Sequence, residues 1–281
     1  MAPSTITCVR HAQGFHNLTV ANHAIHDPLL TPMGEEQCRI LAQNFPKAHM
    51  DQIELIIASP LKRTIYTALL SFAPVIKQKN LKVLLLPELQ ETSDLPCDTG
   101  SSLEEIRKEF AGQPIDTSIM EMSQNADWTS KTGRWAPNSS AIEERAKVAR
   151  EFLYSRDEKE VAVVTHGGFL HYFTQDWSDI SRLDGTPSAG TGWANTEYRH
   201  YIVTTPNGEV QLVETPESRK KRLPDVKPLS KEEQKNLQRA TQAQWAEQER
   251  QEKEYYRVNS IQAKLRAKQR DRDLGGYSFG I

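Results

Sequence analysis

The sequence predicts an α/β domain with a mostly parallel sheet, followed by a long helical tail. Short apolar runs alternate with segments of helical apolar spacing over the first two thirds of the chain, which is typical of strand–helix units in a parallel sheet. Two of these runs end in histidine, at His11 and at His166, and polar side chains at strand ends mark the ligand-binding edge of such a sheet. After Pro216 the chain becomes rich in Gln, Glu, Lys and Arg, a composition that favours helix.

Length and charge indicate one domain with an appendage. The chain has 281 residues, of which 37% are hydrophobic, enough for one large α/β domain. Residues 1–216 carry 19 basic and 27 acidic side chains, whereas residues 217–281 carry 16 basic and 10 acidic ones. This change of sign predicts a domain over 1–216 and a charged, mainly helical extension over 217–281.

The cysteines and the N-terminus favour a cytoplasmic protein. Cys8, Cys38 and Cys97 are odd in number and widely spaced, so they predict neither a disulfide framework nor a metal cluster. No basic segment followed by an apolar run opens the chain, and its longest apolar stretches, such as 81–86, are too short to span a bilayer. We therefore expect no secretion and no membrane contact.

The first predicted strand, Ile6–Val9, ends in Arg10 and His11. Arg matches a phosphate bidentately, and His can act as a nucleophile or a proton carrier near neutral pH. Because these side chains follow a strand, we expect them at the ligand-binding edge of the sheet.

The polar segment 17–30 is predicted to connect this strand to the next helix. Three histidines in and just before it are candidate metal ligands: His16, His23 and His26. No carboxylate or Cys recurs near them at the spacing of a metal site. We therefore expect exposed histidines there, and neither a metal nor another cofactor.

Two helices and a strand follow. Thr31 and Pro32 are predicted to open a helix, Thr as the N-cap and Pro at the first helical position. The apolar run 52–58 is a predicted buried strand. Ser59-Pro60 repeats the capping pattern, so Arg63 falls in the first turn of a second helix, where the helix amino end also favours an anion.

A third strand, predicted at Lys82–Leu86, leads to several acidic residues: Glu88, Glu91, Asp94 and Asp98. Residues 92–140 are predicted to form an inserted cap, with a short helix at 101–110. Lys131, Arg134 and two tryptophans, Trp128 and Trp135, lie in this segment. These side chains could grip the part of a substrate beyond its phosphate, or the tryptophans could pack as ordinary core residues.

A helix, a strand, another helix and a closing hairpin complete the predicted domain. Their ranges are 141–153, 160–165, a helix from near Phe169, and strands 197–204 and 209–213. The strand 160–165 ends in His166-Gly167-Gly168, which matches the strand-end histidine at position 11. We therefore expect the two histidines to act together.

The extension begins with a basic cluster at 219–224, read RKKRLP. It is a candidate nuclear localisation signal or a solvated linker. Ser230 and Glu233 form a predicted capping box for a helix that runs to about Asp273. The net positive charge of this tail also permits contact with nucleic acid or with a protein partner.

Five motifs together resemble those of the histidine phosphatase superfamily, also called the phosphoglycerate-mutase-like superfamily. They are RHAQ at 10–13, LTPMGEEQ at 30–37, SPLKRTIYTA at 59–68, ELQE at 88–91 and VVTHGG at 163–168. The resemblance covers about residues 5–215 and implies a three-layer α/β/α fold of the phosphoglycerate-mutase type. The family's first triplet is usually Arg-His-Gly; Ala12 stands in the Gly place here, which removes some backbone freedom.

The resemblance implies a metal-independent phosphomonoester hydrolase that acts on a small phosphorylated metabolite. His11 would be the nucleophile and would form a phosphohistidine. The residues implied in holding the transferred phosphate are Arg10, Asn17, Arg63, His166 and Gly167. Glu91 would protonate the leaving alcohol and then take a proton from water, which requires a raised pKa; Glu88, Asp94 and Asp98 stay open as alternative acids.

Two other functions stay open. A phosphoglycerate-type mutase would return an isomerised phosphoglycerate instead of free phosphate. A non-catalytic interaction module would act through the charged tail. The presence of both histidines, both arginines and an acid favours an enzyme.

Overall fold

The protein is built on a seven-stranded sheet with the strand order β4-β3-β2-β5-β1-β6-β7. A computed structural model describes residues 3–178, 192–224 and 227–275. The strands are β1 (Thr5–Arg10), β2 (Leu55–Ala58), β3 (Val83–Leu85), β4 (Ile115–Asp116), β5 (Glu160–Thr165), β6 (Tyr198–Thr204) and β7 (Gln211–Glu214). Strands β1 to β5 pair in parallel, while β6 and β7 pair antiparallel at one edge. The predicted mostly parallel sheet is confirmed.

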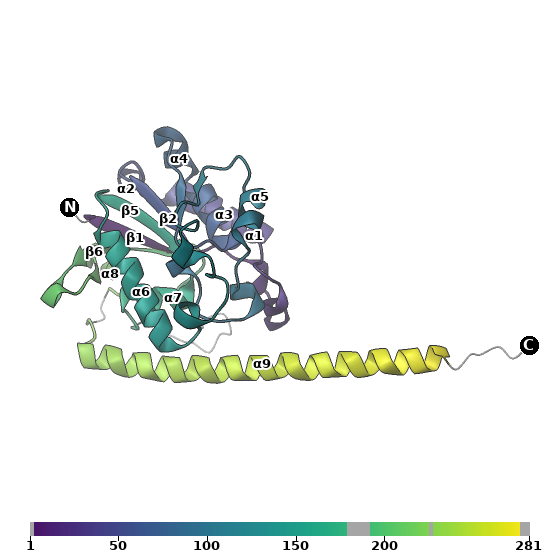
Figure 1. Ribbon diagram of the computed structural model, residues 1–281. Helices are drawn as coiled ribbons and strands as arrows, with labels where there is room; N and C mark the ends of the chain where they lie inside the picture. The colour runs from purple at the N-terminus through teal and green to yellow at the C-terminus, as the bar shows by residue number, and fades with distance from the viewer. Residues whose placement is uncertain (1–2, 179–191, 225–226, 276–281) are drawn as a thin grey trace, which may run out of the picture. The chain divides into compact units, whose positions relative to one another are not determined.

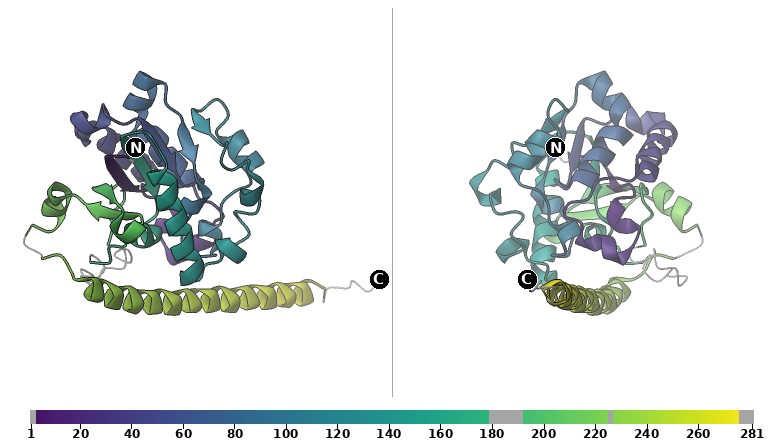
Figure 2. Two further views of the ribbon diagram at one scale, coloured as in Figure 1. Left: turned by 60° about the vertical axis from the view of Figure 1, so that its left-hand side comes forward. Right: turned by 90° about the vertical axis from the view of Figure 1, so that its right-hand side faces the viewer.

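Helices cover both faces of this sheet and give three layers (Figure 1). The described residues before position 230 form eight α-helices. They are α1 (Pro32–Asn44), α2 (Lys47–Met50), α3 (Lys62–Ser71), α4 (Ala73–Lys79), α5 (Leu103–Glu109), α6 (Ser139–Tyr154), α7 (Gly167–Thr174) and α8 (Pro216–Arg222). Helices α1 and α3 pack together, as do α6 and α7. The views in Figure 2 show the two groups on opposite sides of the strands.

The register of β1 and β5 brings distant parts of the chain together at one edge. Thr5 pairs with Glu160 and Arg10 pairs with Thr165. One residue later, the His11 amide donates to the Thr165 carbonyl over 2.9 Å. Because both strands run in the same direction, the residues that follow them emerge side by side.

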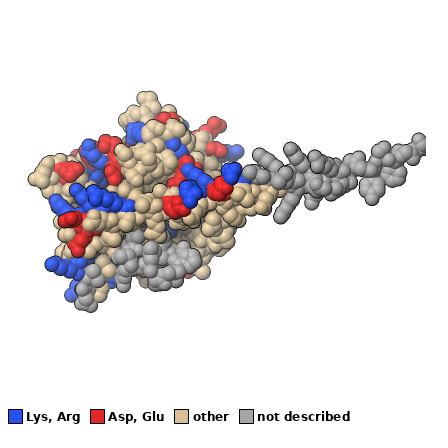
Figure 3. Space-filling view, turned by 90° about the horizontal axis from the view of Figure 1, so that it is seen from below, with Lys and Arg blue, Asp and Glu red and all other residues tan. Residues whose placement is uncertain are grey.

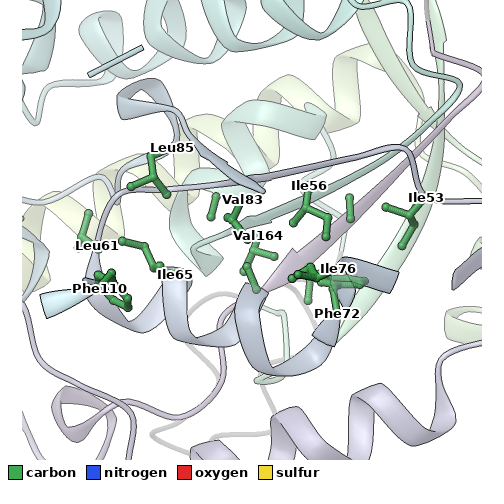
Figure 4. Close-up of a cluster of buried hydrophobic side chains, with 14 of the residues drawn as sticks. Ile53, Ile56, Leu61, Ile65, Phe72, Ile76, Val83, Leu85, Phe110 and Val164 are labelled. Atoms are coloured by element: carbon green, nitrogen blue, oxygen red, sulfur yellow. The ribbon is translucent and has the colours of Figure 1, made fainter. Parts of the chain in front are cut away.

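A large hydrophobic cluster lies between the sheet and helices α1, α3 and α4 (Figure 4). Members labelled in the figure are Ile53, Ile56, Leu61, Ile65, Phe72, Ile76, Val83, Leu85, Phe110 and Val164. Trp128 and Trp135 belong to the same cluster and are 3% and 1% exposed. Of the two roles left open for these tryptophans, core packing is the one that their burial supports.

Some predictions of caps and turns are confirmed, and others are wrong. The Thr31 cap is confirmed, because its hydroxyl accepts from the Gly34 amide over 3.0 Å. The closing hairpin is confirmed by the antiparallel pairing of β6 and β7. The predicted cap at Ser59 is wrong: the N-cap of α3 is Leu61, which makes no side-chain cap bond. Helices α2, α4 and α8 and strand β4 were not predicted.

The chain forms two compact units, Met1–Leu237 and Gln238–Ile281. Helix α8 belongs to the first, where Arg222 pairs with Asp176 over 2.9 Å and with Glu214 over 2.5 Å. The predicted division at residue 216 stays a prediction.

A long helix, α9 (Lys231–Gly275), forms most of the tail. The predicted capping box is confirmed: Ser230 donates to the Glu233 carboxylate, and the Glu233 amide donates back to the Ser230 hydroxyl. Basic and acidic side chains are interspersed along its described part (Figure 3), with ion pairs such as Arg250–Glu247 and Lys253–Glu249. No helix among the described residues is both long enough and apolar enough to cross a membrane.

Candidate active site

The structure brings both predicted histidines together at the carboxyl ends of β1 and β5. The ring centroids of His11 and His166 are 5.2 Å apart, and the two side chains are 2% and 0% exposed. Arg10 is the last residue of β1, and Arg63 lies in the first turn of α3. Both guanidinium groups act electrostatically on His11, so the four side chains share one site.

His11 is held in a single tautomer. Its Nδ1 lies 2.7 Å from the Ala12 carbonyl oxygen. A carbonyl can only accept, so Nδ1 carries the proton and Nε2 keeps its lone pair. Burial lowers the pKa of His11 well below its usual value, and Arg63 and Arg10 lower it further. The ring is therefore neutral near pH 7, with Nε2 free to act as a nucleophile.

His166 and Arg63 form a buried hydrogen-bonded pair. The Arg63 guanidinium donates to His166 Nδ1 over 3.0 Å, so the neutral imidazole carries its proton on Nε2, which lies 2.8 Å from the Ser59 hydroxyl. Arg63 also donates to the Cys97 carbonyl and to the Asp98 carboxylate, over 2.6 and 2.9 Å. Ser59, predicted as a helix cap, is thus part of this site.

A loop before β6 fixes the turn that carries Arg10 and His11. Arg10 donates to the Trp193 carbonyl. The Asn195 carboxamide donates to the His11 carbonyl over 2.9 Å. The amide of Thr196 donates to the Arg10 carbonyl over 3.1 Å, and Thr196 has a φ of 58°, a strained value for a β-branched residue. None of these three loop residues was predicted.

Several polar nitrogens in the site are buried and have no hydrogen-bond partner among the described residues. They are the Nε atoms of Arg10 and Arg63 and Nδ1 of His16. A buried polar group without a partner costs about 1–3 kcal/mol. Two guanidinium N–H groups held in this way suit an anion, because they can donate charge-assisted bonds to its oxygens.

Glu91 accepts hydrogen bonds at the start of α7, directly after His166. Its carboxylate accepts from the amides of Thr92, Gly168 and Phe169 over 2.9, 3.2 and 2.9 Å. Burial raises the pKa of Glu91, and Asp98 raises it further, while Arg63 and the amides of Thr92 and Gly168 oppose the shift. The close contact explains one glycine: a Cβ on Gly168 would lie 2.7 Å from Glu91 Oε1.

Two of the alternative acids, Glu88 and Asp98, have other surroundings. Glu88 is buried and pairs with Arg134. Asp98 pairs with Arg63 and also accepts from the Ser93 hydroxyl over 2.6 Å. Glu91 combines a raised pKa with a place beside His166, so it is the acid that these contacts favour.

The remaining predicted residues lie close by. Gly167 is the first residue of α7 and is buried. Asn17 is exposed, and its carboxamide oxygen accepts from the Gly14 amide over 3.0 Å, which fixes the loop after β1. Ala12 does not have a positive φ, unlike Asp27 farther along the same connection. The substitution of Ala for Gly therefore introduces no left-handed strain.

His16 is a site residue that the sequence did not reveal. The expectation of an exposed histidine is wrong here: His16 is 7% exposed, and its ring centroid lies 5.3 Å from that of His11. Burial lowers its pKa well below the usual value, as do Arg63 and His11. Within the described residues, no group of three or more His, Cys, Asp or Glu side chains has the arrangement of a metal site.

Three kinds of comparison with known proteins give matches. The family model of the histidine phosphatase superfamily (branch 1) matches residues 6–215. A protein of Schizosaccharomyces pombe named as a probable phosphatase is 30% identical over 184 residues, which cover 65% of this chain and 83% of its own. A phosphoglycerate mutase-like protein of Arabidopsis thaliana is 34% identical over 235 residues, with coverage of 71% and 84%. A solved mycobacterial glucosyl-3-phosphoglycerate phosphatase aligns with 81% of this chain and all of its own at 18% identity, with a TM-score of 0.44.

Proposed function

We propose that this chain, which belongs to the histidine phosphatase superfamily, branch 1, is a metal-independent phosphomonoester hydrolase that works through a phosphohistidine at His11. The substrate class is a small phosphorylated metabolite. One observation carries the proposal: Nδ1 of His11 is bonded to the Ala12 carbonyl, which leaves Nε2 of this buried ring with a free lone pair, and two guanidinium groups act on the ring electrostatically.

The first half-reaction transfers the phosphoryl group to the enzyme. His11 Nε2 attacks phosphorus, the bond to the leaving oxygen breaks, and Glu91 gives its proton to that oxygen. Arg10 and Arg63 offset the negative charge of the phosphate. Each charge-assisted hydrogen bond contributes roughly 1.5–3 kcal/mol, so a few such donors hold the group without a metal.

The second half-reaction releases phosphate. Glu91, now ionised, takes a proton from a water molecule as the water oxygen attacks the phosphohistidine. The bond between phosphorus and Nε2 breaks, and the neutral ring of His11 is restored. The raised pKa of Glu91 supports this two-way role, because an acid–base catalyst works best with a pKa near the working pH.

Phosphate release from an aryl phosphate in the presence of a chelator tests the proposal. The intact protein should release phosphate, and His11→Ala should lose nearly all of this activity while it keeps its folded spectrum. An intact protein that releases no phosphate, or a His11→Ala protein that is as active as the intact one, would refute the hydrolase mechanism.

A mutase is the second candidate, because a relative from Arabidopsis thaliana is named phosphoglycerate mutase-like. Incubation with 3-phosphoglycerate separates the two functions. The hydrolase proposal predicts free phosphate and glycerate. A mutase would instead produce 2-phosphoglycerate and little free phosphate.

A further inference from the structure

Arg145 is a buried cation that reaches the backbone of the segment that carries Glu91. It lies on α6 and is 3% exposed. Its guanidinium donates to the carbonyls of Glu88, Gln90 and Glu91 over 2.9, 2.5 and 3.2 Å. These acceptors lie within four consecutive residues of the chain. One side chain from a distant helix therefore holds most of the main chain at 88–91.

The segment 88–91 has little regular structure of its own. Pro87–Leu89 form a single 3₁₀ turn, and such short turns leave carbonyl groups that need other donors. The remaining carbonyl, that of Leu89, accepts from the Thr165 hydroxyl over 2.6 Å. Thr165 is the last residue of β5 and precedes His166. Side chains of α6 and β5 thus set the position of this segment.

Arg145 also contacts the residue that holds the Glu91 carboxylate. The guanidinium carbon lies 4.7 Å from the centroid of the Phe169 ring, a distance typical of a cation–π contact. The amide of Phe169 donates to Glu91 Oε1 over 2.9 Å. Helix α6 packs on both the 3₁₀ turn at 87–89 and α7. Arg145 therefore joins the main chain of Glu91 to the helix start that binds its carboxylate.

The three contacts require an arginine. Among the described residues, the hydrogen bonds of the Arg145 guanidinium go to carbonyl oxygens, not to a carboxylate. Burial lowers the pKa of Arg145 to about 10, so the group stays charged near pH 7. A planar guanidinium presents several N–H groups in fixed directions, whereas a lysine presents one ammonium on a flexible stem. Lysine could therefore not hold the three carbonyls in the same way.

We propose that Arg145 is a positioning residue for Glu91. It acts through the acid, which it keeps at the place that proton transfer to the leaving oxygen requires, and not on the substrate. The inference rests on the proposed function, because that mechanism makes Glu91 the acid. A misplacement of about 1 Å can cost about 10²-fold in rate. A loosened segment should therefore slow those substrates that need the proton.

Arg150 provides a matched control on the same helix. It is 5% exposed. Its guanidinium donates to the carbonyls of Val210, Tyr172 and Phe173 over 3.0, 3.0 and 3.2 Å. Its burial and its kind of partner are those of Arg145, but it holds the end of α7 and the segment before β7. Its replacement therefore measures the effect of losing a buried structural arginine.

The test compares Arg145→Lys with Arg150→Lys on an alkyl and an aryl phosphate. Both changes should lower the urea midpoint of unfolding. Only Arg145→Lys should lower kcat/KM for the alkyl phosphate by about 10-fold or more, with a change below about 3-fold for the aryl phosphate, whose leaving group needs little acid assistance. Equal losses on both substrates, or the same selective loss in Arg150→Lys, would overturn the proposal.

Glu91→Gln separates a failure of this inference from a failure of the proposed function. In the Glu91→Gln background, Arg145→Lys should cause no further selective loss on the alkyl phosphate, because the acid is already absent. A further selective loss would mean that Arg145 acts independently of Glu91. If Glu91→Gln alone causes no selective loss, the proposed acid is wrong. If it does and Arg145→Lys does not, only the positioning role is wrong.

Arg145→Ala gives a second test that does not depend on the lysine variant. Arg145 lines a cavity of about 310 Å³ together with Arg134, Asn138 and Glu144, so a small solute can reach the space that the shortened side chain leaves. Millimolar guanidinium should restore part of the rate on the alkyl phosphate and leave the rate on the aryl phosphate unchanged. Absence of rescue, or equal rescue on both substrates, would count against the proposal.

Discussion

Glu91 is the residue whose protonation state the proposed reaction depends on most. General acid catalysis contributes about 10²–10⁴-fold, and it matters most for poor leaving groups. Glu91→Gln should therefore reduce kcat/KM, which reports the phosphorylation step, by about that factor for an alkyl phosphate and far less for an aryl phosphate. Steady-state rates on the two substrates measure this. An equal loss on both would mean that Glu91 does not protonate the leaving oxygen.

The raised pKa of Glu91 also fixes the direction of the pH effect. Because the pKa is raised, the acid form survives to a higher pH than in a free carboxyl. The phosphorylation rate on an alkyl phosphate should fall as pH rises through that pKa. This limb should be absent in Glu91→Gln, as measured by single-turnover rates between pH 4 and 9. A limb that persists in the variant belongs to another group.

Gly168 offers a test of the position of Glu91. Ala at 168 would bring a Cβ within 2.7 Å of Glu91 Oε1, the end of a side chain that can move. Gly168→Ala should cost little stability, about 1 kcal/mol or less, but should displace the carboxylate and reduce kcat. The loss should not add to that of Glu91→Gln, because both changes act through one carboxylate. Additive losses in the double variant would contradict this coupling.

The sequence analysis failed to identify some single residues of the site. The strand-end positions of Arg10 and His166 were predictable from local patterns. His16 and Ser59 were not, because their burial depends on how the loop after β1 folds back and on how β2 and β5 pair. Ser59-Pro60 matches a helix-cap pattern, yet the hydroxyl of Ser59 bonds instead to a histidine that is more than a hundred residues away.

At the scale of elements, Asp27 fastens the connection after β1 to helix α3 and to the segment before α5. It is 2% exposed, and its carboxylate accepts from the Lys62 amide over 3.0 Å and from the Ser101 amide and hydroxyl over 3.0 and 2.7 Å. Lys62 is the first residue of α3 and precedes Arg63. This clasp therefore fixes the start of the helix that carries a phosphate-binding arginine.

Removal of the clasp should affect both stability and activity. Asp27→Ala leaves buried donors without a partner and should lower the free energy of unfolding by about 2–4 kcal/mol. It should also weaken phosphate binding through Arg63. Urea unfolding and the inhibition constant for phosphate measure the two effects. Asp51→Ala is the control, since its pair with Lys47 is exposed and worth about 0–1 kcal/mol; a loss as large there would argue against the clasp.

The order and type of the main elements followed from the sequence, because apolar periodicity and caps are local. The bounds of the predicted strand 160–165 agree with those of β5. Helix α7 begins at Gly167, two residues earlier than expected. The residues of the loop at 193–196 gave no local pattern, because their partners are far away in the sequence: Asn195 and Thr196 donate to the backbone carbonyls of His11 and Arg10. The Trp193 carbonyl accepts from the Arg10 guanidinium.

At the scale of the whole molecule, the division into two units predicts that two shortened chains differ in stability. A chain that ends at Leu237 keeps the first unit intact, so it should keep the kcat and stability of the full protein. A chain that ends at Pro216 loses Arg222, whose partner Asp176 has a side chain that is 13% exposed and a pKa lowered to about 2. Loss of a buried ion-pair partner costs about 3–5 kcal/mol, so the shorter chain should unfold at a lower urea concentration. Equal stability of both truncated chains would contradict this account.

The roles predicted for the tail and the location of the protein stay predictions. Of the basic cluster at 219–224, Arg219 and Arg222 are paired with acids of the first unit, which leaves fewer free cations for an import receptor than the sequence suggested.

The central claim is that His11 carries the phosphoryl group between the two half-reactions. Rapid mixing with substrate, an alkaline quench and tandem mass spectrometry test it most directly, because a phosphohistidine survives base and is lost in acid. The account predicts one added phosphoryl group, on His11, which builds up in Glu91→Gln when an aryl phosphate is the substrate. Phosphate release without any labelled histidine, or with the label on His16 or His166, would contradict it.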